Sequence, residues 1–218
     1  MRLKRSSKIL IFLCFFNLLT VGVTGCGKDK PPVSANPISP SPNPTSPSPN
    51  PTSPSPALKV YQFQISRYIT ASLDEARADV ILKDGSAVLQ AKDGPEDMVC
   101  PVELRRAGGV TVFTTGNGAV NSEADYKAIL ALPGQIKVVN QINWCGAFTP
   151  NIIGCAPTPG SSLIVVRDTP SQEGILWDHE FGHNKGLVHR SESTAMMNAV
   201  IGADHGVLNE AESKAIQE

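Results

Sequence analysis

The segment His179–His189 constrains this chain more than any other part of it, because it holds three of the four histidines in 218 residues. His179 and His183 are four residues apart, so a helix places both imidazoles on one face, where they can reach a single ion. Gly186 adopts a positive φ at little cost and can end that helix, which lets the chain turn back and bring in His189. The spacing predicts one Zn²⁺ ion held by these three histidines, with a fourth position left open as in catalytic sites.

Glu180 follows the first of these histidines and is the predicted catalytic residue. On a helix its side chain points about a quarter turn away from the two imidazoles. It is then close enough to accept a proton from water at the metal, but poorly placed to bind the metal itself. The alternative, in which the histidines are ordinary core or surface residues, leaves their spacing unexplained.

The residues before the histidines predict a buried helix. Thr169–Gln172 has the composition of a helix start, with Thr169 as N-cap and proline in the first turn. Trp177 and Phe181 lie on roughly the opposite face from the histidines, so the helix is expected to be buried on both sides. Such a helix would be a rigid support for metal ligands.

The pattern His-Glu-x-x-His-x-x-Gly-x-x-His resembles the signature of the metzincin zinc endopeptidases. Met197, eight residues after His189, is similar in spacing to the Met-turn of the matrixin branch, with Met196 as its apolar neighbour. Arg190 matches none of the usual residues at its position, and Ala199 stands where some branches have a metal-coordinating tyrosine. The resemblance is therefore to the clan and not to one subfamily.

This resemblance implies a fold and an activity. The fold would be an α/β, metzincin-like zincin with a twisted mixed sheet, an active-site helix, a backing helix and a small C-terminal subdomain that holds the Met-turn. The activity would be hydrolysis of peptide bonds in a protein or peptide substrate by a zinc-bound water that Glu180 activates. Ile152–Ala156 and Leu163–Val166 look like the metzincin edge strand and its neighbour, which implies that backbone groups of Gly154 and Ala156 bind substrate. Residues 198–206 are either a pocket wall or an ordinary surface loop.

Other secondary structure follows from local patterns. Ser72–Glu75 and Asn209–Glu212 read as capping boxes that open helices, although Asp84-Gly85 weakens the first of these helices. A third short helix is expected over Ser122–Leu132. Runs rich in β-branched residues predict further strands at Val99–Leu104, Val110–Thr114 and Lys137–Ile142.

The N-terminus predicts export from the cytoplasm. Four basic residues precede an apolar run over Ile9–Val21, which is shorter than the roughly 20 residues of a membrane span. Val23–Cys26 resembles the lipobox of bacterial lipoproteins, so residues 1–25 are expected to be a signal peptide and Cys26 the lipidated N-terminus. Two acyl chains would anchor the protein at the outer membrane or cell surface. An ordinary secretory signal is the alternative.

The remaining chain divides by composition. Residues 26–56 form a linker rich in proline and serine, which predicts an extended stalk. Residues 57–218 are long enough for the catalytic domain. The net charge of −1 and the absence of a basic block exclude a nucleic-acid partner, and a monomer is expected.

Three cysteines stay in this domain: Cys100, Cys145 and Cys155. Outside the cytoplasm a disulfide is expected, and Cys145–Cys155 is the first choice, with Cys100 and either of the others as alternatives. A free cysteine as a thiolate latch on zinc is disfavoured, because no propeptide-like sequence surrounds Cys100.

Three functions are compatible with these residues: an active endopeptidase, a non-catalytic surface binding module stabilised by zinc, and a zinc hydrolase of a cell-wall amide. Glu180 favours an enzyme, since a binding module has no need of a base.

Overall fold

The structure is a computed structural model, and it describes residues 57–218. The predicted signal peptide (1–25), Cys26 and the linker (26–56) lie outside the described residues, so these remain predictions. Between residues 57 and 218, no helix combines the length and the apolar character that crossing a membrane requires.

A five-stranded mixed sheet forms the centre of the fold, with the strand order β4-β2-β6-β10-β9. The strands are β2 (Ile65–Tyr68), β4 (Thr111–Phe113), β6 (Ile136–Val139), β9 (Gly154–Cys155) and β10 (Leu163–Val166). Four of them are parallel, whereas β9 runs antiparallel to β10 at the edge of the sheet. β10 has the predicted bounds, and its run of β-branched and leucine side chains is almost fully buried, as expected for a strand covered on both faces.

Two smaller sheets flank the central one. β1 (Lys59–Phe63) pairs in parallel with β3 (Val102–Arg106), and β5 (Ala119–Val120), β7 (Gln141–Trp144) and β8 (Phe148–Ile152) form a three-stranded sheet. The predicted single strand Lys137–Ile142 is therefore wrong, because β6 and β7 belong to different sheets. The chain leaves the central sheet at Asn140, whose N–H donates to the Gly118 carbonyl at 2.8 Å. The predicted strand Ile152–Ala156 is likewise divided between β8 and β9.

Four helices complete the fold: α1 (Glu75–Gln90), α2 (Glu123–Leu130), α3 (Glu173–Asn184) and α4 (Glu210–Gln217). The capping box of α4 is confirmed: the Asn209 side chain and the Glu212 side chain each accept the other's backbone N–H. The predicted N-cap of α1, Ser72, is two residues too early. The N-cap is Asp74, whose side chain accepts a hydrogen bond from the Arg77 N–H. The start of α3 was also too early, because Thr169 makes a turn that precedes the helix.

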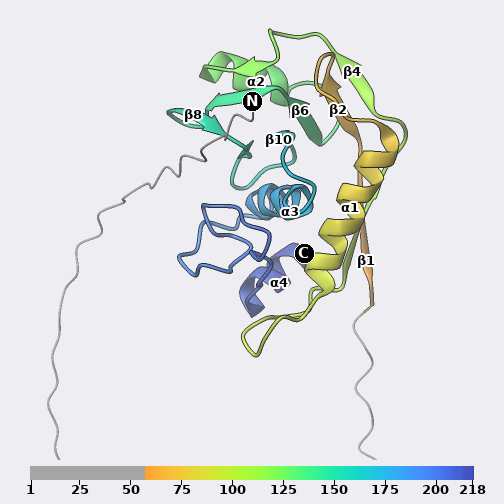
Figure 1. Cartoon of the computed structure of the whole chain (residues 1–218), viewed down its shortest axis with the longest axis vertical. Coiled ribbons are helices and arrows are strands. Elements are labelled where there is room, and N and C mark those ends of the chain that lie inside the picture. Colours follow the sequence, from red (N-terminus) through yellow and green to blue (C-terminus); the bar gives the residue numbers. More distant parts are fainter. Residues whose placement is uncertain (1–56) are drawn as a thin grey trace, which may run out of the picture. The chain divides into compact units, whose positions relative to one another are not determined.

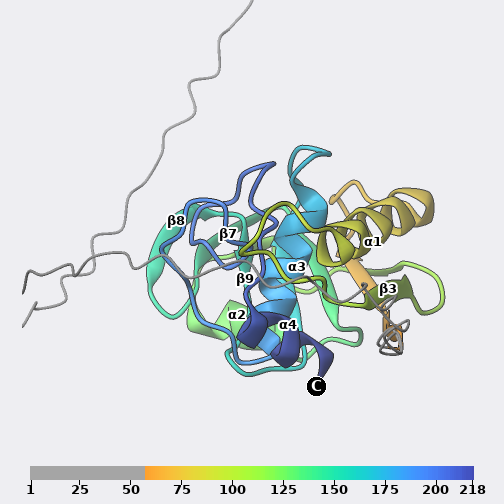
Figure 2. The same cartoon turned by 90° about the horizontal axis from the view of Figure 1, so that it is seen from below.

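α3 lies at the centre of the molecule, between the sheet on one side and the C-terminal segment with α4 on the other, while α1 runs beside it (Figure 1). Figure 2 shows the same arrangement from below, with α1 again next to α3. The two helices approach closely through glycines: a Cβ on Gly174 would lie 2.7 Å from the Gly85 backbone nitrogen. The glycine that weakened the helix prediction is thus the point at which α3 contacts α1.

Two apolar cores support the sheet. The larger core packs α1, α3 and α4 against one face, and Trp177 and Phe181 of α3 are both buried in it. The smaller core joins strands β6, β9 and β10 of the central sheet to α2 and to the sheet β5-β7-β8. α3 is therefore buried around almost its whole circumference, as its sequence predicted.

Candidate metal centre

The three histidines of the predicted site come together at the C-terminal end of α3. His179 and His183 are on the helix itself, and Gly186 follows its end with a φ of +85°. The Leu187 N–H donates back to the Gly182 carbonyl at 3.0 Å, which turns the chain towards His189. Among the described residues, these histidines are the one group of three or more candidate ligands found, with ligand atoms within 4.8 Å of one another.

The orientation of the two rings on α3 is set by their Nδ1 atoms. His179 Nδ1–H donates to the Met196 carbonyl and His183 Nδ1–H to the Leu187 carbonyl, both at 2.8 Å. A neutral imidazole that donates from Nδ1 has a lone pair on Nε2. Both Nε2 atoms lie 3.2 Å from Nε2 of His189, which has at most one proton to donate there. At least two lone pairs therefore face each other at the centre, and a cation would resolve their repulsion.

The spacing fits zinc. A tetrahedral ion with Zn–N bonds of about 2.0–2.1 Å separates its nitrogen ligands by about 3.3 Å, close to the 3.2 Å found here. Burial, with a smaller contribution from the neighbouring imidazoles, lowers the pKa of His179 to about 3. Burial also lowers the pKa values of His183 and His189. These shifts favour the neutral form of the imidazoles, which metal ligation requires.

Glu180 is buried at 4 % exposure, and its carboxylate packs against the edge strand β9. A Cβ on Gly154 would lie 2.1 Å from Glu180 Oε1, so only glycine leaves space for this carboxylate. Glu180 Oε2 has no hydrogen-bond partner among the described residues. Burial raises the pKa of Glu180 to about 8, and a dication nearby would lower it again. One oxygen of this carboxylate is therefore buried without a protein partner.

The two methionines of the predicted Met-turn are fully buried. A Cβ on Gly182 would meet Met197 Sδ at 2.5 Å, so the methionine packs directly on the helix turn between His179 and His183. Met196 supplies the carbonyl that holds the His179 ring. The segment after the third histidine therefore lies beneath the helix that carries the first two.

The predicted substrate strand is at the edge of the central sheet. Gly154 is in β9, Ala156 follows it, and a disulfide joins Cys155 to Cys145 at the turn between β7 and β8. The third cysteine, Cys100, is free and fully buried, with its Sγ 3.6 Å from the Ser213 carbonyl of α4. It does not belong to the metal-site group, so the structure offers no support for a thiolate latch.

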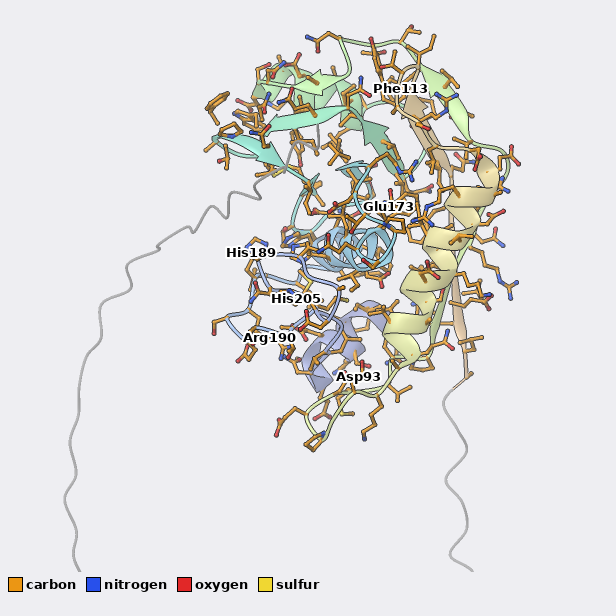
Figure 3. The ribbon with its side chains drawn as sticks, viewed as in Figure 1. Asp93, Phe113, Glu173, His189, Arg190 and His205 are labelled. Carbon is orange, nitrogen blue, oxygen red and sulfur yellow. A yellow bond between two sulfur atoms is a disulfide. The ribbon has the colours of Figure 1, made fainter. Side chains whose placement is uncertain are left out.

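Two polar residues of α3 that the sequence analysis did not single out bind neighbouring segments through their side chains. Glu173 is fully buried and binds Arg77 of α1 and Arg167, which follows β10, so it joins the start of α3 to both neighbours. Figure 3 shows Glu173 on the side of α3 that faces α1. At the other end, Asn184 Nδ2–H donates to the carbonyls of Pro157 and Ser162 and so holds the loop that follows β9. The sequence shows an acidic residue near the start of this helix, but it does not show that Glu173 is buried or which arginines it binds.

The fourth histidine, His205, takes no part in the cluster. Its Nδ1–H donates to the Val200 carbonyl at 2.7 Å within its own loop, and its Nε2 is 3.6 Å from Asp204 Oδ1.

Comparison with known proteins gives a structural likeness only. No protein-family model matches the sequence, and no curated protein sequence matches it. The fold is similar to the crystal structure of archaemetzincin from Methanopyrus kandleri, with 11 % identity and a TM-score of 0.50, over 73 % of this chain and 94 % of that one. Archaemetzincin from Archaeoglobus fulgidus, in complex with malonate, gives 13 % identity and a TM-score of 0.46 over 72 % and 99 % of the two chains. The predicted metzincin-like α/β fold is thus confirmed.

Proposed function

We propose that this protein is a zinc-dependent endopeptidase in which His179, His183 and His189 hold one Zn²⁺ and Glu180 is the general base. The observation that carries the proposal is that Nε2 of His179 and Nε2 of His183 each lie 3.2 Å from Nε2 of His189. The residue after His179 is the buried Glu180, whose Oε2 has no protein partner among the described residues. Three imidazoles leave a coordination position open, which suits catalysis. The metzincin-like fold is consistent with this chemistry.

Zinc bound at this centre would polarise the scissile carbonyl and acidify water to a pKa of about 7. The Glu180 carboxylate takes the proton from the attacking water and afterwards donates it to the leaving nitrogen.

The edge strand supports a peptide as substrate. β9 is the last strand of the central sheet, so one of its sides has no strand neighbour within that sheet. An extended peptide can pair with such an edge through main-chain hydrogen bonds, here to Gly154 and Ala156. Since Gly154 also touches Glu180, the peptide would be held next to the general base.

We also propose that the protein works outside the cytoplasm, as a lipoprotein anchored through Cys26. The disulfide between Cys145 and Cys155 supports an oxidising compartment. Labelling of the chain with a fatty acid, and its loss in Cys26→Ser, would test the anchor.

The test of the activity uses the full chain and a denatured protein as substrate. Glu180→Gln should keep one zinc per chain and lose cleavage by a factor of about 10²–10⁴, the usual contribution of a general base. Glu123→Gln makes the same change at an exposed glutamate of α2, which is paired with Lys127. It is the matched control and should cleave normally. Turnover by Glu180→Gln equal to wild type would refute the role of Glu180.

The same protein separates the alternatives. A zinc-loaded wild-type chain that binds unfolded protein without cleaving it would indicate a binding module. Release of cell-wall fragments without proteolysis would indicate an amide hydrolase of the cell wall.

A further inference from the structure

We infer that Arg190 is a positioning residue that couples the C-terminal helix α4 to the third metal ligand, so that docking of α4 controls zinc affinity. This inference rests on the proposed metal centre, because it assigns a role towards the same ion. Arg190 is the residue that departed from the family pattern in the sequence, and the structure shows what it contacts.

The three ligands are not held equally. His179 and His183 are on a helix, and each ring is oriented by a hydrogen bond from Nδ1 to a carbonyl. His189 lies in an exposed loop, and within residues 57–218 no hydrogen bond fixes its Nδ1. Because nothing holds the His189 ring from its far side, its position depends on the backbone that carries it. The adjacent residue, Arg190, contacts later segments of the chain through both its backbone and its side chain.

Arg190 is fixed from both its backbone and its side chain. Its N–H donates to the Met197 carbonyl at 2.9 Å, which ties the chain after His189 to the Met-turn. Its Nη2–H donates to the Val207 carbonyl at 2.8 Å. Its Nε lies 3.2 Å from Glu212 Oε1. The two groups form an ion pair, but they are not aligned for a hydrogen bond. One side chain thus joins the ligand loop to two later segments of the chain.

The Val207 carbonyl links two of the ligands through one atom. It accepts one hydrogen bond from the Arg190 guanidinium and a second, of 3.0 Å, from the Met196 N–H. The Met196 carbonyl in turn accepts His179 Nδ1–H. A shift of this carbonyl would therefore move the supports of His179 and His189 together.

Glu212 gives Arg190 a rigid anchor. Its Oε2 accepts the Asn209 N–H at 2.8 Å in the capping box of α4, so its other oxygen is held towards Arg190. Ile216 of the same helix is fully buried in the main core, which fixes α4 to the rest of the fold. The buried Glu212 would lose its charge partner if Arg190 were removed.

This arrangement makes a reciprocal prediction. If docking of α4 holds His189 in place, zinc bound to His189 must stabilise the docking of α4 by the same free energy. A side chain that serves only general stability would change the unfolding free energy without changing zinc affinity in the folded state.

The experiment measures zinc affinity of the full chain by competition with a chromophoric chelator. Arg190→Met keeps the apolar stem and removes the guanidinium, and it should weaken zinc binding about 10–100-fold, the usual effect of removing a group that orients a ligand. Arg190→Lys should recover only part of this, since an ammonium lacks the fork that reaches two acceptors. The matched control is Arg106→Met, which removes a guanidinium paired with Asp79 and Glu75 away from the site. It should leave zinc affinity within twofold of wild type.

The visible spectrum of the Co²⁺-loaded protein is a second readout. Wild type should show the strong absorption of a four-coordinate site, and Arg190→Met should show a weaker band as His189 is lost from the ion. Unchanged zinc affinity and an unchanged spectrum in folded Arg190→Met would overturn the inference and leave the endopeptidase proposal intact.

Failure of the metal centre itself is recognised separately. If wild type binds no zinc, or if His183→Ala binds it as tightly, the proposed function fails before Arg190 is considered. Should Arg190→Met not fold, hydrogen exchange of wild type decides: zinc should slow exchange of the α4 amides, and equal exchange with and without zinc would refute the coupling.

Discussion

The helix that carries two of the proposed zinc ligands and the loop that carries the third are built in opposite ways. Eleven of the twelve residues of α3 are buried, including His179 and Glu180. In the loop, by contrast, Gly186, Val188 and His189 are exposed. The helix is fixed by the same packing that folds the domain, whereas the loop depends on a few polar contacts. Folding and metal binding are therefore expected to separate in mutants of the two regions.

The largest effect should come from the ligands themselves. Dividing the roughly 10–16 kcal/mol of a four-ligand zinc site among its ligands gives about 3 kcal/mol each, so His179→Ala and His189→Ala should each weaken zinc binding more than about 100-fold. Only His179→Ala should also destabilise the metal-free protein, by about 1–2 kcal/mol, because it removes a buried ring and its bond to Met196. Chemical denaturation with chelator present measures this difference. Equal losses of metal-free stability in the two variants would break the comparison.

The next effect concerns the anchor of the helix. Glu173→Gln should lower the unfolding free energy by about 3 kcal/mol, because two arginines lose a buried charge partner. Under conditions in which the variant is fully folded, its zinc affinity should remain close to that of wild type, since Glu173 is remote from the loop that carries His189. Urea denaturation at pH 7 tests the first expectation and chelator competition the second.

The same anchor predicts a pH dependence. Burial acts to raise the pKa of Glu173, but hydrogen bonds from Arg167 and Arg77 outweigh it, and the pKa lies below its ordinary value. Its contribution to stability is then fully present above the unfolded pKa of about 4.3 and is lost as the pH falls through the lower folded pKa. Wild type and Glu173→Gln should differ by a constant amount above about pH 4.3 and approach each other below it. A difference that grows on acidification would contradict the sign.

A smaller effect is expected where helix and loop touch. A Cβ on Gly182 would lie 2.5 Å from Met197 Sδ, so Gly182→Ala should cost about 1–2 kcal/mol, the cost of overpacking less the gain in helix propensity. It should also weaken zinc binding, because displacement of the methionines moves the carbonyl that orients His179. Unfolding free energy at or above that of wild type would show that the Met-turn does not pack as described.

The smallest effect should be in the exposed part of the loop. Val188, between two of the ligands, is 71 % exposed. Val188→Ser should therefore change both the unfolding free energy and zinc affinity by less than about 0.5 kcal/mol. A larger loss of zinc affinity would mean that the loop has an intrinsic conformational preference of its own, beyond the contacts made through Arg190.

Local sequence determined the elements that depend on near neighbours in the chain. The spacing of His179 and His183, the positive φ of Gly186, the capping box of α4 and the bounds of β10 are all set within a few residues, by helix period, backbone sterics or a run of β-branched side chains. The fold class followed from the resemblance carried by this same short segment. Such signals can be read from sequence because the interacting groups are close along the chain.

Tertiary structure decided everything that joins distant segments. The partner of Glu173 on α1 is 96 residues away, the approach of Gly85 to Gly174 turns a weak helix position into a contact, and the run Lys137–Ile142 enters two sheets. The pairing of Arg190 with Glu212 belongs to the same class. Spacing within one element says which face a side chain occupies. It does not say which other element packs on that face, because that choice is made by the packing of the whole core.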